Sequence, residues 1–189
     1  MKNFKISIIC LFFATLMNAQ KKGVQLKINV LNNDVDKIFL RNKSDIVLTI
    51  NLKNKNTFAS SFDITEGIYQ IKYDAMYTDV YLKNGFNLKV AFDGLHFYET
   101  LKFEGIGAAE NNYIALEFKK EDDFDEQAIY GLNNLDFETY LSTVEKNKLE
   151  LLQEQSFSNY FTDYEKKCIA SKILKIRDLY QDRKLTQKK

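Results

Sequence analysis

Proline and tryptophan are absent from this chain of 189 residues, and it contains a single histidine, His96, and two cysteines. Without proline, the turns must depend on glycine, asparagine and aspartate. A lone histidine in a loop, with no neighbouring nucleophile, is a poor candidate for a general base or a metal ligand, and we expect a structural or solvent-facing role. The formal net charge of +1 argues against bulk electrostatic binding of nucleic acid.

The first residues are typical of a targeting segment. Lys2 and Lys5 precede an apolar run from Ile6 to Leu16, and small or tolerated residues follow up to Ala19. We expect residues 1–19 to be a signal peptide that is cleaved after Ala19, which exports the chain to the periplasm or cell envelope. The apolar run is shorter than the ~20 residues that a membrane span needs, and no second long run follows, so we expect no transmembrane segment.

Cleavage would leave Cys168 as the only cysteine, because Cys10 lies inside the signal peptide. An intramolecular disulfide and Cys-x-x-Cys exchange chemistry are therefore both excluded for the mature chain. Cys168 falls within the apolar stripe of the last predicted helix, which predicts a buried, inert thiol.

Residues 20–107 show the period-two alternation of strands that bury one face. The first strand alternates over 24–30, and similar short segments recur as far as a last strand from Tyr98 to Phe103. Asn84-Gly85 is the strongest short hairpin signal and predicts a β-hairpin between the sixth and seventh segments. About eight strands with frequent turns predict an antiparallel β-sandwich or open barrel.

Residues 108–189 follow helical spacing, and six of the seven glycines lie at or before Gly107. The expected class is α+β, with a β domain over 20–107 and a helical region packed on or following it. We expect about three helices, which begin at Ala108, at Asn133 or Asn134, and near Asn159 or Thr162.

Two short segments could bind ions, a phosphate in one and a metal in the other, but an ordinary turn or loop explains each of them better. The Gly105-Ile106-Gly107 stretch precedes a helix but lacks the third glycine and the lysine of phosphate-binding loops, so a strand-to-helix turn with positive φ is preferred. An acidic run offers oxygen ligands but lacks EF-hand spacing, and a solvated loop is preferred; the run consists of Glu121, Asp122, Asp123, Asp125 and Glu126.

Other candidates rest on weaker patterns. The basic residues of the C-terminal helix are expected to face solvent or to pair with the acidic segment 117–126. A hydrolase that uses two carboxylates would use Asp93 and Glu99. Their closeness in sequence is the only feature that supports this hypothesis. Four strand tyrosines are expected in the core or on the sheet surface in preference to a ligand platform, namely Tyr69, Tyr73, Tyr77 and Tyr81.

Three segments together resemble the N-terminal domain of exported TlpA-like, thioredoxin-type thiol:disulfide oxidoreductases of Bacteroidetes. They are Glu-Gly-Ile-Tyr at 66–69, Val-Tyr-Leu-Lys-Asn-Gly-Phe-Asn-Leu at 80–88, and Gly-Ile-Gly-Ala-Ala-Glu-Asn-Asn-Tyr at 105–113. The resemblance covers most of the mature chain. It implies a structural joint between the β domain and the helices, formed by Gly105, Gly107, Asn111, Asn112 and Tyr113.

In that family a thioredoxin-fold domain with a Trp-Cys-x-x-Cys site would follow, whereas this sequence ends at Lys189 without one. No catalytic, cofactor or metal residue is carried over, and the chain is either truncated or a stand-alone relative. The expected function is a non-catalytic exported module that positions or binds a protein partner, or a missing thioredoxin domain, in cell-envelope thiol redox. The alternative is an exported β-sandwich that binds a sugar, peptide or lipid.

Overall fold

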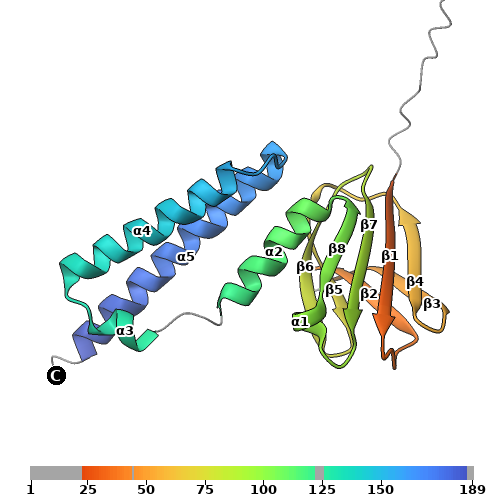
Figure 1. Cartoon of the computed structure of the whole chain (residues 1–189), viewed down its shortest axis with the longest axis horizontal. Helices are drawn as coiled ribbons and strands as arrows, with labels where there is room; N and C mark the ends of the chain where they lie inside the picture. The colour runs from red at the N-terminus through yellow and green to blue at the C-terminus, as the bar shows by residue number, and fades with distance from the viewer. Residues whose placement is uncertain (1–22, 44, 122–125, 187–189) are drawn as a thin grey trace, which may run out of the picture.

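The computed structural model describes residues 23–43, 45–121 and 126–186, in which eight strands form one curled sheet (Figure 1). The spatial order is β6-β5-β2-β3-β4-β1-β7-β8, so β6 and β8 are the two edges. The strands are β1 (Val24–Leu31), β2 (Lys37–Asn42), β3 (Asp45–Asn54), β4 (Thr57–Phe62), β5 (Gly67–Tyr73), β6 (Met76–Leu82), β7 (Asn87–Asp93) and β8 (Lys102–Ile106).

Strand β1 lies in the interior of the sheet and shows why the alternation predicts strands correctly. Its even-numbered residues from Val24 to Val30 are all buried, while Gln25 and Lys27 face solvent. It pairs antiparallel with β4 and parallel with β7. The parallel pair departs from the antiparallel expectation, and its register aligns Ile28 with Val90 so that both apolar rows face the same core.

The predicted β-hairpin at Asn84-Gly85 is wrong, because β6 and β7 are not neighbours in the sheet. A tight turn does form: the Phe86 amide donates to the Lys83 carbonyl at 3.1 Å, and Gly85 has φ +96°. The Asn84 side chain accepts from the Ile64 amide at 2.9 Å. The turn chemistry was therefore correct, but the turn carries the chain from one edge of the curled sheet to the strand beside the other edge.

The predicted last strand from Tyr98 to Phe103 is also wrong in its first half. A short helix, α1 (Phe97–Thr100), precedes β8. The Phe97 ring is buried edge-on against Phe92, with 4.5 Å between ring centroids, and the Thr100 hydroxyl accepts from the Asp93 amide at 2.8 Å. These contacts with β7 outweigh the weak local preference for a strand.

The remaining helices confirm the α+β class: α2 (Ala108–Glu121), α3 (Glu126–Gly131), α4 (Asn134–Gln153) and α5 (Asn159–Thr186). The short helices α1 and α3 add to the three that were expected. Asn133 caps α4, since its side chain accepts from the Asp136 amide at 3.0 Å. Helices α4 and α5 form a hairpin that extends away from the sheet (Figure 1). No helix in the described ranges is long and apolar enough to cross a membrane.

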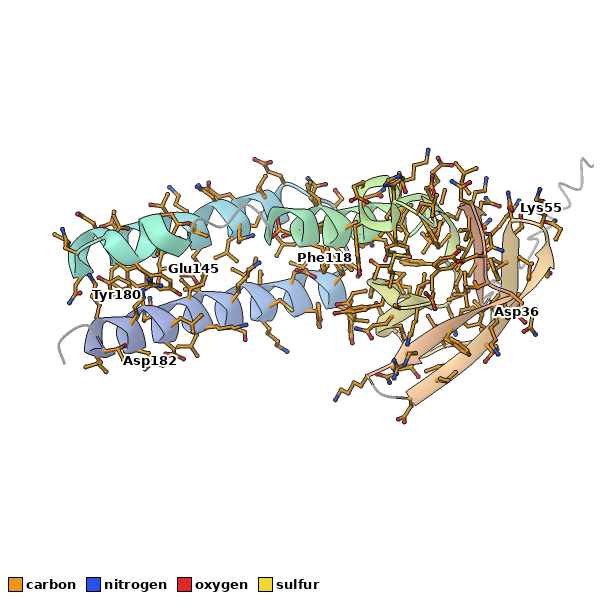
Figure 2. The ribbon with its side chains drawn as sticks, turned by 90° about the horizontal axis from the view of Figure 1, so that it is seen from below. Asp36, Lys55, Phe118, Glu145, Tyr180 and Asp182 are labelled. Atoms are coloured by element: carbon orange, nitrogen blue, oxygen red, sulfur yellow. The ribbon has the colours of Figure 1, made fainter. Side chains whose placement is uncertain are left out.

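Two hydrophobic clusters organise the packing. The first fills the concave side of the sheet and includes Phe161, from the start of α5. The second lies between α3, α4 and α5, and its far end is closed by Tyr180, which stacks on Phe137 with 3.6 Å between ring centroids (Figure 2). Tyr113 and Phe157 pack against both clusters. The base of the hairpin therefore belongs to the core of the sheet, whereas its far end has a core of its own.

Candidate functional site

Helix α2 bridges the two open edges of the sheet through consecutive asparagines. Asn111 is fully buried and pairs with the outer edge of β6, because its Oδ1 accepts from the Tyr81 amide at 2.8 Å and its Nδ2 donates to the Tyr81 carbonyl at 3.0 Å. Its Nδ2 also donates to the Gly107 carbonyl at 2.7 Å. A side-chain amide here takes the place of a neighbouring strand.

Asn112 does the same for the opposite edge. Its Oδ1 accepts from the Phe103 amide at 3.0 Å, and its Nδ2 donates to the Phe103 carbonyl of β8 at 2.9 Å. Both ends of the sheet are thus attached to one turn of α2, which holds the sheet in its curled shape.

The turn before α2 requires glycine, as the sequence indicated. Gly105 and Gly107 have φ values of +93° and +98°. A Cβ at Gly107 would lie 2.2 Å from the Phe86 ring. Tyr113, on the next turn of α2, meets the Phe157 ring edge-on. The structure therefore brings the residues of the proposed joint together around α2 and the outer strands.

Tyr81 connects the joint to α5. Its hydroxyl donates to the Glu66 carboxylate and lies 2.8 Å from Ser158 Oγ, which must be the donor to it because the phenol has a single proton. The Tyr81 ring is also stacked beside Tyr160, at 6.0 Å between centroids. Burial and the Glu66 carboxylate raise the pKa of Tyr81 well above its usual range, so the phenol stays neutral.

Two adjacent cavities lie where α5 passes the β5–β6 edge. We call the first the tyrosine cleft; it has a volume of about 610 Å³, and its walls include Asn42, Glu66, Tyr69, Gln70, Tyr160 and Tyr164. We call the second the acidic cavity; it has a volume of about 310 Å³, and its walls include Tyr77, Asp79, Glu117, Phe118, Glu165 and Cys168. Ile68, Gln70, Asp79 and Tyr164 border both.

The acidic cavity contains the most perturbed carboxyl group of the described chain. Glu165 is 9% exposed. Burial, together with the nearby carboxylates of Glu117 and Asp79, raises its pKa to about 7, while Lys148 opposes the shift. Lys148 itself pairs with Glu117, and each of these side chains is 20% exposed. Glu165 therefore changes its charge near neutral pH.

Cys168 forms part of the wall of the same cavity and is half-buried. Burial raises the pKa of its thiol, while the hydrogen bond from Tyr164 partly opposes this. The thiol is therefore less ionised than a free cysteine at neutral pH. The prediction of a buried side chain is met only in part, because Cys168 is half-buried in the cavity wall.

The other sequence candidates are scattered. His96 is exposed at the start of α1. Asp93 accepts from Asn32 Nδ2 at 3.0 and 3.1 Å and from the Leu95 amide at 2.9 Å, and these bonds lower its pKa. It is thus an ionised turn residue and unsuited to act as a general acid with Glu99. Residues 122–125 of the acidic run lie outside the described ranges.

The strand tyrosines meet the expectation, and the basic helix meets it in part, because Lys166, Lys167, Lys175 and Arg183 face solvent. Tyr69, Tyr73 and Tyr81 are buried in the core, and Tyr77 is 45% exposed on the edge strand β6. In the basic helix, Arg177 forms a two-pronged ion pair with Glu138 of α4, with its shortest nitrogen–oxygen distance 2.9 Å. That partner lies outside the acidic segment 117–126.

Glu165 was missed by sequence reasoning, although a signal existed. It stands on the stripe Phe161–Glu165–Ile169, whose flanking members are both buried. Residues four apart lie on one helix face, so a carboxylate between two core residues predicts a buried charge.

Across the described ranges, no group of three His, Cys, Asp or Glu side chains is arranged to hold a metal ion. Comparisons with protein-family models, curated proteins and solved structures found no match to this chain.

Proposed function

We propose that this chain is an exported, non-catalytic module of the cell envelope that binds a protein partner by strand pairing at the outer edge of β6. The observation that carries the proposal is which residues of β6 direct their backbone amide and carbonyl groups outward, away from β5. Tyr81 directs its backbone amide and carbonyl away from β5, towards Asn111. The β5–β6 register is unbroken, so Tyr77 and Asp79 direct theirs the same way.

The outer edge at Tyr77 and Asp79 opens onto the acidic cavity rather than onto an asparagine side chain. In the described ranges, the one side-chain hydrogen bond to a backbone group of Tyr77 or Asp79 comes from the Thr78 hydroxyl, which donates to the Asp79 carbonyl at 3.2 Å. An extended peptide could therefore continue the sheet at this point, with Tyr77 and the exposed Phe118 ring beside it.

The expected partner is a thioredoxin-type domain, in the same polypeptide or in a separate one. Support comes from the resemblance of 66–69, 80–88 and 105–113 to TlpA-like N-terminal domains. The chain itself supplies one half-buried thiol, Cys168, with a raised pKa. We expect the purified chain not to reduce insulin disulfides, and turnover that depends on Cys168 would contradict a non-catalytic role.

A photoreactive benzoylphenylalanine at position 118, in cells that produce the protein, tests the pairing. We expect a discrete adduct with one protein, and its loss in a Tyr77→Pro variant. Proline removes an amide that points away from β5, so the β5–β6 ladder stays intact. Tyr77→Thr, which keeps the amide, should retain the adduct.

The matched control places the photoreactive residue at Ile46, which is 57% exposed on the interior strand β3. It should give no adduct with the same protein. An adduct that survives Tyr77→Pro while circular dichroism shows a folded chain would rule out strand pairing.

The tyrosine cleft favours a second candidate, the binding of a sugar. Its walls combine Tyr69, Tyr160 and Tyr164 with Asn42 and Gln70. Aromatic faces with convergent polar groups suit a sugar better than a lipid chain. Binding on a panel of immobilised oligosaccharides should be lost in Tyr160→Ala; the absence of binding, or binding unchanged by this variant, would contradict the idea.

A further inference from the structure

The acidic cavity has an incomplete charge balance. Three carboxylates border it, from Asp79 of β6, Glu117 of α2 and Glu165 of α5. Glu117 is paired with Lys148 of α4, and Asp79 accepts from Gln70 Nε2 at 3.0 Å. Among the side chains that the structure describes, none donates a hydrogen bond to Glu165 or forms an ion pair with it. Among the described side chains, Lys148 is the cation paired at this cavity, and three carboxylates border it.

An uncompensated carboxylate at this depth is costly, since Glu165 is about nine-tenths buried and its side chain forms part of the cavity wall. Its titratable neighbours among the described side chains of the other elements are Glu117 and Tyr113 of α2, Lys148 of α4 and Asp79 of β6. Of these only Lys148 is cationic, and it is already paired. A second cation in the cavity would offset the buried charge.

The walls indicate what kind of cation fits. Tyr77, Phe118 and Tyr164 form part of the cavity wall, and aromatic faces attract organic cations. The volume of about 310 Å³ exceeds what a bare metal ion fills and accommodates a short alkyl chain with a charged head. Carboxylates together with ring faces therefore favour an organic ammonium or guanidinium group over a hydrated metal ion.

We infer that the acidic cavity is a binding site for an alkylammonium or guanidinium group, with Glu165 as its counter-ion. The group belongs either to a free amine or to a lysine or arginine side chain of a peptide. This site does not depend on strand pairing at β6, because a free amine needs no edge. Binding strengthens as pH rises, because the cation requires Glu165 to be ionised.

Isothermal titration calorimetry in phosphate buffer tests the site, with n-propylammonium chloride in one arm and the peptide acetyl-Gly-Lys-Gly-amide in the other. We expect saturable binding at pH 8 and at least tenfold weaker binding at pH 6. Binding in both arms identifies a site for the amine head alone, while binding of only the peptide identifies a side-chain pocket. Saturable binding of either probe supports the inference.

Glu165→Gln keeps the shape of the side chain and removes its charge, so it should weaken binding at least tenfold and abolish the pH dependence. Glu150→Gln, which alters an exposed ion pair on α4, should change neither. Absence of binding by both probes, binding unaffected by Glu165→Gln, or preferential binding of Ca²⁺ that excludes the amine would each overturn the inference.

Cys168 reports whether the amine occupies this cavity, since the residue forms part of the cavity wall. In a Cys10→Ser chain, Cys168 is the only cysteine. Saturating n-propylammonium should slow its alkylation by N-ethylmaleimide severalfold, and only when Glu165 is present. Equal alkylation rates with and without the amine, at concentrations where calorimetry shows saturation, would place binding elsewhere and overturn the assignment.

Discussion

At the scale of single residues, Glu165 couples the stability of the fold to pH. Its carboxyl has a pKa of about 7 in the folded chain, against 4.5 when unfolded. Between these values the folded state binds more protons than the unfolded state, so this group lowers stability as pH rises from 4.5 to 7. Above pH 7 the full cost is present, on the order of 3 kcal/mol from the size of the shift.

Glu165→Gln should therefore raise the free energy of unfolding at pH 8 by about 1–3 kcal/mol and leave it nearly unchanged at pH 4.5. Urea unfolding at the two pH values, followed by circular dichroism, measures the difference. Glu150→Gln on the exposed face of α4 is the control and should shift neither midpoint. An equal gain at both pH values would indicate a packing effect and contradict the coupling.

At the scale of elements, α2 holds the curled sheet through two asparagines that differ in burial. Asn111 is fully buried and makes three bonds to backbone groups, whereas Asn112 is exposed and makes two. Asn111→Ala leaves the buried amide and carbonyl of Tyr81 unpaired, while Asn112→Ala lets water replace the lost bonds.

We expect Asn111→Ala to lower the free energy of unfolding by about 2–4 kcal/mol and Asn112→Ala by about 1 kcal/mol or less. Urea unfolding of the two variants gives the comparison. Hydrogen exchange should also accelerate at the Tyr81 amide in the first variant only. Similar losses in both variants would mean that burial of the edge of β6 is not what makes Asn111 important.

At the scale of the whole molecule, two cores share one long helix. Phe161, at the start of α5, belongs to the core of the sheet, whereas Ile169, Ile173 and Tyr180 belong to the core of the helical hairpin. The far end of the hairpin should therefore open without loss of the sheet.

Leu141→Ala removes a side chain of α4 that is 1% exposed in the second core. We expect the hairpin to lose about 2–5 kcal/mol of local stability, as large-to-small core changes do. Hydrogen exchange followed by mass spectrometry should show faster exchange in α4 and the second half of α5, with β1 and β7 unchanged. Leu135→Ala, at a position 78% exposed, is the control. Faster exchange throughout the sheet would show a single cooperative unit.

Much of the local structure was determined by the sequence itself. Alternation at Val24 to Val30 predicts a strand with one buried face, Asn133 caps a helix, and the glycines at 105 and 107 adopt positive φ. Each of these depends on a few neighbouring residues, whose sterics and hydrogen bonds act over a single turn or strand. The α+β class follows from their order along the chain.

Only the tertiary structure decided which strands meet and which polar groups are buried together. The turn at Asn84-Gly85 does not specify its partner strands, and the parallel β1–β7 pair arises because the chain crosses between the edges of the sheet. The acidic cavity is assembled from β6, α2 and α5, with Lys148 of α4 beside it, so its residues are far apart in sequence. Long-range packing and desolvation create such a site, and neither leaves a local pattern beyond one carboxylate, Glu165, on an apolar stripe.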